Sequence, residues 1–177
     1  QDRADRIAHV LTQDMGVVPG NRVLLRASNN PMLAACWFAV MKAGAIAVAT
    51  MPMLRAKELK AIIDIGRVTH ALCDASLADE LQQASSALKL SLFNTSGPGS
   101  LEAAMQQHDA PFAAIDTAAD DTCLFAFTSG TTGVPKATMH FHRDIIAACR
   151  CWPPHVLRAT EDDVFIGSDT QLVAPVT

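Results

Sequence analysis

Five short apolar runs, separated by segments of helical period, are the feature that most constrains how this chain folds. They are RVLLRA, AIAVAT, HALC, LKLSLF and TCLFAF, at residues 22–27, 45–50, 70–73, 88–93 and 122–127. Short apolar runs of this kind between turn and helix signals are typical of buried strands. Strands that alternate with helices require crossover connections, and such connections produce a mainly parallel sheet.

The segments between the runs predict helices that cover both faces of this sheet. One helix begins at Pro31, where a missing N–H is harmless, and extends to about residue 42. Apolar positions at helical period mark the others: Ile7, Val10, Leu11 and Met15; Leu59, Ile62 and Ile63; Leu77, Leu81, Ala84 and Leu88; Ile145, Ile146 and Cys149. For the third of these, Ser76 and Asp79 form the expected capping pair. The predicted fold class is α/β, a mainly parallel sheet with helices on both faces.

Length and charge narrow the possible classes further. With 177 residues, half of them apolar, the chain has the size of one domain, and it can bury a sizeable core. The net charge is −4 and the 14 basic residues are scattered, so the sequence predicts no nucleic-acid binding. Residues 94–121 begin with a turn cluster and continue without a clear period, so we expect a surface excursion there.

The cysteines and one long apolar segment bear on the cellular compartment and on membrane association. Cysteines 36, 73, 123, 149 and 151 are odd in number, which favours free thiols and a reducing, cytoplasmic compartment. We expect Cys149 and Cys151 to be packing residues. Residues 32–50 could pass for a membrane span, but Lys42 and Gly44 divide them into a buried helix and a strand, so no membrane association is expected. The N-terminus lacks both a Met and a signal-peptide core, so the chain is expected to be a piece of a longer protein.

The segment FTSGTTGVPK, residues 127–136, follows the last predicted strand. Its glycines can turn backbone N–H groups inward around an anion, its hydroxyls add donors, and its lysine supplies a positive charge. The candidate phosphate ligands are Thr128, Ser129, Gly130, Thr131, Thr132, Gly133 and Lys136. A simple turn between two strands is the alternative, but this combination of residues favours a phosphate loop. The G-x-x-x-x-G-K-[ST] pattern of common NTPases is not present.

This segment resembles the phosphate-loop signature of the adenylate-forming superfamily, which includes acyl- and aryl-CoA synthetases, peptide-synthetase adenylation domains and adenylating luciferases. Residues 16–59 resemble the N-terminal region of these enzymes. Within them, NPMLAACWFAVMKAGA and MPMLRAKEL are most similar to ligases for benzoate and aminobenzoate. The resemblance implies that residues 1–177 are a partial N-terminal (AMP-binding) domain and that the C-terminal part of the enzyme is absent.

The resemblance also implies a reaction. A carboxylic acid attacks the α-phosphorus of Mg·ATP to give an acyl-adenylate and pyrophosphate, and CoA then displaces AMP. Loop 128–136 would hold the β- and γ-phosphates and stabilise the leaving pyrophosphate, although Ala137 stands where many relatives have Gly. The implied cofactors are ATP, Mg and CoA, the last two needing parts outside this chain. No catalytic residue is expected within it, so the chain alone should not complete catalysis.

Several alternatives remain open. They are a peptide-synthetase-type adenylation domain, a stand-alone nucleotide- or anion-binding module, and a non-catalytic interaction protein.

His140 and His142 lack a further ligand at a zinc spacing, so no metal site is expected, and His142 is interpreted as a helix start. Glu161 and Asp162 are interpreted as a solvated turn or cap. Because an incomplete domain leaves apolar faces uncovered, we also expect self-association.

Overall fold

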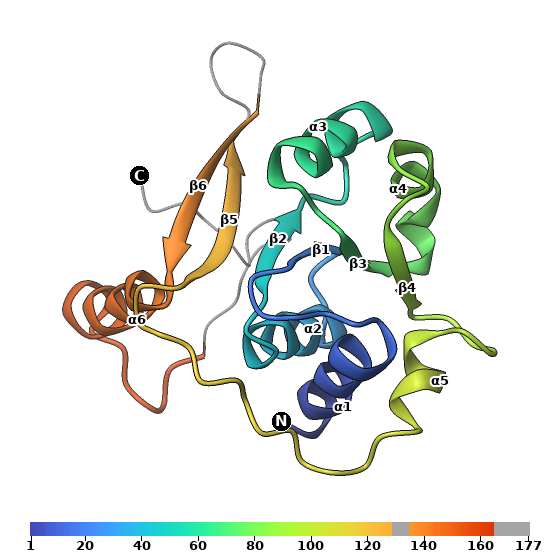
Figure 1. Ribbon diagram of the computed structural model, residues 1–177. Coiled ribbons are helices and arrows are strands. Elements are labelled where there is room, and N and C mark those ends of the chain that lie inside the picture. The colour runs from blue at the N-terminus through green and yellow to red at the C-terminus, as the bar shows by residue number, and fades with distance from the viewer. Residues whose placement is uncertain (129–134, 165–177) are drawn as a thin grey trace.

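A six-stranded sheet forms the centre of the protein, with the strand order β4-β3-β1-β2-β5-β6 (Figure 1). The computed structural model describes residues 1–128 and 135–164. The strands are β1 (Arg22–Arg26), β2 (Ile46–Thr50), β3 (His70–Asp74), β4 (Lys89–Phe93), β5 (Thr122–Thr128) and β6 (Lys136–Phe141). The first five run parallel, and β6 pairs antiparallel with β5.

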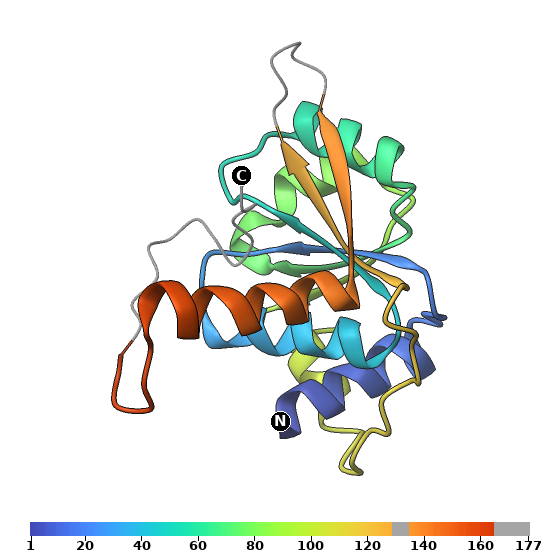
Figure 2. The same ribbon diagram turned by 90° about the vertical axis from the view of Figure 1, so that its left-hand side faces the viewer.

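Helices lie on both faces of this sheet (Figures 1 and 2). They are α1 (Asp2–His9), which continues into η1 (Val10–Asp14), α2 (Pro31–Lys42), α3 (Ala56–Gly66), η2 (Ala75–Leu77), α4 (Ala78–Ala84), α5 (Leu101–Met105), α6 (His142–Cys151) and η3 (Trp152–Leu157). One core cluster joins α1, α2 and α5 to the sheet, and a second joins α3 and α4 to its other face. The α/β prediction is therefore confirmed.

Strand β1 shows why the apolar runs predicted the sheet so well. Val23 and Leu25 belong to the cluster beneath α1 and α2, whereas Leu24 belongs to the cluster beneath α3. All three side chains are almost completely buried. Because a central parallel strand is covered on both faces, its sequence is continuously apolar rather than alternating.

The predicted cap, Ser76 with Asp79, of the helix that carries Leu77, Leu81 and Ala84 is wrong. The carboxylate of Asp74 accepts the backbone N–H of Ser76 at 2.9 Å and its hydroxyl at 2.6 Å, and η2 begins there. The Ser76 hydroxyl is thus occupied and does not cap a helix. The α-helix starts at Ala78 and ends at Ala84, so Leu88 lies outside it.

Strand β6 and helix α5 are two elements that the sequence analysis did not predict. The strand occupies residues 136–141, part of which we assigned to the loop. Helix α5 lies within residues 94–121; Ser100 caps it by accepting the N–H of Ala103 at 3.2 Å, and its Leu101 and Met105 are buried. Later in this segment, the N–H of Ile115 donates to the carbonyl of Lys42 at 2.8 Å, which attaches it to the end of α2.

Arg26 is the largest fully buried side chain, at 1% exposure, and it ends β1. Its guanidinium donates to four backbone carbonyls, those of Met51 (3.0 Å), Pro52 (3.0 Å), Leu54 (2.8 Å) and Leu77 (3.1 Å). Burial lowers the pKa of Arg26, but an arginine stays protonated in a protein. This single side chain therefore connects the segment after β2 with the segment after β3.

We predict that Arg26→Met lowers the free energy of unfolding by at least about 3 kcal/mol, because several buried carbonyls lose their donor at once. Urea unfolding followed by circular dichroism measures this. Arg150→Met, at an exposed position on α6, is the matched control and should change the value by less than about 0.5 kcal/mol. A loss below about 1 kcal/mol for Arg26→Met would contradict the assigned role.

The cysteines divide into two groups. Cys36, Cys73 and Cys123 are buried, as expected for free thiols in apolar runs, and burial raises the pKa of Cys73 to about 12. Cys149 and Cys151 are exposed, so the expectation that they are packing residues is wrong. The reason is that α6 buries none of its residues within the described chain and packs against the core through the half-buried Ile145 alone.

We therefore predict that a thiol reagent such as Ellman's reagent labels two cysteines rapidly in the folded protein and three only after unfolding, because only an accessible thiolate reacts. The double variant Cys149→Ser, Cys151→Ser should lose the rapid phase entirely. A rapid phase that persists in this variant would show that a buried thiol is accessible.

Candidate functional site

Strands β5 and β6 form a hairpin whose connection is the predicted phosphate loop. Strand β5 ends at Thr128 and β6 begins at Lys136, and these two residues lie directly opposite each other in the antiparallel register. Both are exposed. Opposite residues in such a pair hold their side chains close together, so the hydroxyl and the ammonium group stand at the same end of the hairpin.

Two of the seven predicted phosphate ligands, Thr128 and Lys136, can thus be placed. The other five, Ser129, Gly130, Thr131, Thr132 and Gly133, lie outside the described residues, and their contacts with phosphate stay a prediction. An antiparallel strand pair can be joined by a simple turn or by a phosphate loop, so the pairing of β5 with β6 is compatible with both interpretations. The choice between these interpretations therefore rests on the residue types.

Aromatic packing fixes the hairpin on the sheet. Phe125 is buried in the cluster beneath α3, and Phe127 packs against the same cluster. Across the pair, the Thr138 hydroxyl donates to the carbonyl of Ala126 at 3.2 Å. Strand β5 also pairs with β2. The base of the loop is consequently held by a rigid part of the fold, which favours precise positioning of a ligand.

Thr128 and Lys136, the two ends of the predicted loop, lie at the carboxyl edge of the parallel strands. Strand β5 runs parallel to β2, β1, β3 and β4, so all five carboxyl ends face the same edge. Residues 51–54, which Arg26 holds in place, follow β2 at that edge. Strand β2 is the neighbour of β5 in the sheet. Open α/β sheets bind their ligands outside the carboxyl ends of the strands.

The remaining candidates behave as structural residues. Across residues 1–128 and 135–164, no group of three His, Cys, Asp or Glu side chains could hold a metal ion. His142 begins α6, as expected. Glu161 and Asp162 form a turn, which the Asp163 carboxylate closes by accepting the N–H of Thr160 at 2.7 Å. No helix in the described part of the chain is long and apolar enough to cross a membrane.

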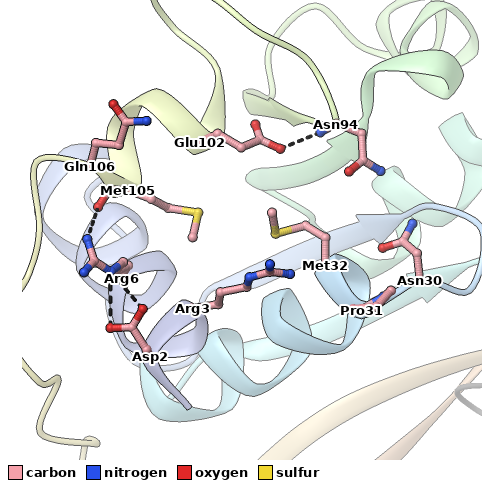
Figure 3. A pocket seen from close by; sticks show the side chains of 10 residues that line it. All are labelled: Asp2, Arg3, Arg6, Asn30, Pro31, Met32, Asn94, Glu102, Met105 and Gln106. Carbon is pink, nitrogen blue, oxygen red and sulfur yellow. Dashed lines mark hydrogen bonds and ion pairs between the residues drawn. The ribbon is translucent and has the colours of Figure 1, made fainter.

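A pocket between α1, α2 and α5 is a further feature that the sequence analysis missed (Figure 3). It has a volume of about 450 Å³. Its charged side chains include Arg3, Arg6 and Glu102, and none of its lining residues comes from the loop at 128–136. No sequence signal marked it, because its walls come from separate segments that only the fold brings together.

Comparison with known proteins gives the family. The model of the family described as AMP-binding enzyme matches residues 1–169. The chain is 25% identical over 166 residues to a benzoate–CoA ligase of Thauera aromatica, covering 92% of this chain and 32% of the relative. It is 30% identical over 152 residues to the long-chain-fatty-acid–CoA ligase FadD13 of Mycobacterium tuberculosis, covering 84% of this chain and 30% of the relative. The chain thus spans about a third of the length of these relatives.

Solved structures agree. The anthranilate CoA ligase AuaEII in complex with anthranoyl-AMP superposes with a TM-score of 0.78 at 22% identity, covering 87% of this chain and 30% of that one. ATP-bound MatB from Rhodopseudomonas palustris superposes with a TM-score of 0.73 at 28% identity, covering 82% and 29% respectively. The expected fold and the expected superfamily are both confirmed. The chain belongs to the AMP-binding enzyme family, and its fold is that of the N-terminal part of the adenylate-forming enzymes.

Proposed function

We propose that this chain is part of an ATP-dependent carboxylic acid:CoA ligase, a partial N-terminal domain in which loop 128–136 holds the β- and γ-phosphates of ATP. The observation that carries the proposal is the placement of Thr128 opposite Lys136 at the carboxyl end of β5. Similar proteins named as CoA ligases, and the ATP and anthranoyl-AMP in the structures of two relatives, support it.

The loop acts by electrostatic stabilisation. When a carboxylate oxygen attacks the α-phosphorus, the bond to the bridging oxygen breaks and negative charge develops on the departing pyrophosphate. Lys136 supplies a positive charge, and the loop's hydroxyl and backbone donors supply hydrogen bonds to that group. Because the hairpin is anchored by Phe125 and Phe127, the lysine and Thr128 need little reorganisation during the reaction.

The acceptor and the metal belong to the complete enzyme in this proposal. CoA takes the acyl group in a second step, when its thiolate displaces AMP from the acyl-adenylate. The described residues form no cluster of metal-binding side chains, so we assign no Mg²⁺ ligand to them. The substrate class that we propose is an aromatic carboxylic acid, because relatives named for benzoate, hydroxybenzoate and anthranilate are among those similar to this chain.

A peptide-synthetase-type adenylation domain is the second candidate. The observation that favours it is the similarity to triostin synthetase I of Streptomyces triostinicus, 29% identical over 183 residues and covering 97% of this chain. In that case a carrier-protein thiol would replace CoA as the acceptor. An assay of the full-length protein with each acceptor in turn distinguishes the two candidates.

We predict that Lys136→Ala weakens pyrophosphate binding by the chain at least about 10-fold, because a charge-assisted contact contributes roughly 1.5–3 kcal/mol. Isothermal titration calorimetry at low salt measures the affinity. Lys60→Ala on α3 removes another exposed lysine, far from the loop in the sequence, and should leave the affinity unchanged.

Binding by the wild-type chain is expected to be weak, with no AMP-forming turnover, since the rest of the enzyme is missing. Equal affinity of Lys136→Ala and wild type would contradict the proposed role of the loop. Tight pyrophosphate binding by the isolated chain would instead favour a stand-alone anion-binding module. A biological role that survives Lys136→Ala unchanged would favour an interaction protein.

Location and assembly complete the proposal. All five cysteines are free, which supports a reducing, cytoplasmic compartment.

Large apolar side chains are exposed on β6, α6 and η3: Met139, Ile146, Trp152, Val156 and Leu157. We infer that a second copy of the chain covers them in solution.

We therefore expect the sedimentation coefficient of the isolated chain to rise with protein concentration. Ile146→Glu should shift this rise to higher concentration, because a charge on the interface opposes desolvation. The exposed control Lys60→Glu should leave it in place. A monomeric profile at every concentration would contradict the inference.

A further inference from the structure

A buried histidine, His70, begins β3 and contacts the end of the N-terminal helix. The residue is 4% exposed. Its Nε2 lies 3.2 Å from the backbone carbonyl of Met15, the residue that follows η1, and its Nδ1 lies 2.8 Å from the hydroxyl of Thr69. A carbonyl oxygen only accepts hydrogen bonds, so Nε2 carries the proton and the Thr69 hydroxyl donates to Nδ1. The neutral imidazole is therefore fully hydrogen-bonded.

Lys89 donates to the same carbonyl from the neighbouring strand. It begins β4 and lies opposite His70 in the parallel register. Its ammonium group donates to the Met15 carbonyl at 3.1 Å. The last carbonyls of a helix lack partners within the helix, and here two side chains of the sheet supply the donors for one of them. Together they attach the end of the N-terminal helix to the amino edge of β3 and β4.

The charge of Lys89 acts on His70 without a balancing carboxylate. Two other charged side chains lie at this end of the neighbouring elements, and both are engaged elsewhere. Arg22, which begins β1, donates to a backbone carbonyl at 3.3 Å, and Asp14, the last residue of η1, pairs with His108 at 3.0 Å. Within the described ranges, no carboxylate forms an ion pair or hydrogen bond with His70.

A second proton on His70 is therefore unfavourable in the folded protein. It would place a buried imidazolium beside the Lys89 ammonium group, and the Thr69 hydroxyl would have to turn from donor to acceptor. Burial lowers the pKa of His70; the hydrogen bond to Met15 opposes this effect, and the charge of Lys89 adds to it. The folded state thus keeps His70 neutral at pH values where the unfolded chain has already taken up the proton.

We propose that His70 and Lys89 form a pH-dependent clasp on the Met15 carbonyl, which attaches the end of the N-terminal helix to the sheet at neutral pH and releases it on acidification. One proton binds at Nδ1 of His70, and the two cations then repel each other across one carbonyl oxygen. The connection of residues 16–21 becomes free to move, while α1 stays attached through its buried apolar face. None of these residues belongs to loop 128–136, so this inference does not rest on the proposed function.

The stability that the clasp contributes depends on pH in one direction. The unfolded chain takes up this proton near pH 6.5, whereas the folded protein does so only at lower pH. The contribution is therefore fully present above about pH 6.5, and it is lost as the pH falls from there through the pKa of His70 in the folded protein.

Urea unfolding and hydrogen exchange at pH values from about 7.5 down to about 5, on both sides of the unperturbed histidine pKa, test the proposal. His70→Gln keeps a side-chain N–H that can reach Met15 but takes up no proton. We expect the urea midpoint of the wild type to fall further on acidification than that of His70→Gln. The amide of Val17, which donates to the Leu11 carbonyl at 2.8 Å beside the clasp, should lose more exchange protection in the wild type than in the variant.

Two lysine variants test whether the charge of Lys89 matters. Lys89→Met keeps an apolar stem but removes the ammonium group, so the His70 ring, followed by NMR, should titrate at a higher pH than in the wild type. A purely structural role of Lys89 would leave this midpoint in place. Lys60→Met, at an exposed position on α3, is the matched control and should leave the midpoint unchanged.

The proposal fails if the wild type and His70→Gln lose the same stability on acidification, or if the His70 ring titrates at or above about pH 6.5. It also fails if Val17 keeps its exchange protection once the ring is protonated, which would mean that the clasp stays closed. Circular dichroism checks that each variant is folded. If His70→Gln is not folded, the ring titrations of the wild type and Lys89→Met decide alone.

Discussion

The buried guanidinium of Arg26 is the interaction on which the carboxyl edge of the sheet depends. Parallel strands leave the carbonyls of their following connections without ladder partners, and a connection that crosses the sheet edge must satisfy them in another way. Arg26 does this for residues 51–54 and for Leu77 with one side chain. The carbonyl dipoles and the nearby Glu80 carboxylate compensate the burial of this cation. The connections after β2 and β3 are thereby fixed to the end of β1.

Two sets of polar groups lie at the edge that this interaction organises. On one side of the sheet order, the β5–β6 hairpin presents Thr128 beside Lys136. On the other, the connections after β1 and β4 enclose a pocket with charges of both signs. Both arrangements depend on the parallel strands ending at a common edge, and both place polar groups on rigid elements. The family to which the chain belongs is shown by the match over residues 1–169, and Thr128 and Lys136 are the ends of the predicted phosphate loop within that match.

Much of the fold could be predicted from the sequence, and what could not be predicted has physical causes. The five parallel strands were predicted because burial on both faces requires continuous apolar runs, as in β1. Strand β6 was missed because an exposed edge strand carries mixed residues such as Lys136 and His140, which give no apolar run. The cap before α4 was assigned to Ser76, but the Asp74 carboxylate accepts both the N–H and the hydroxyl of Ser76, so η2 begins there first. For the site, the phosphate loop is a prediction from residue types alone, and only its flanks, Thr128 and Lys136, are placed by the hairpin.

The sequence by itself determined the α/β class, the positions of the five parallel strands and the superfamily, because apolar runs and the FTSGTTGVPK segment are local patterns. Only the tertiary structure decided which distant residues meet. In the sequence Arg26 belongs to an apolar run, and only the fold places carbonyls around its guanidinium. Arg3 and Glu102 are about a hundred positions apart in the sequence, and the packing of α1 against α5 brings both to one pocket. Contacts of this kind follow from strand order and helix packing, and those depend on the whole chain at once.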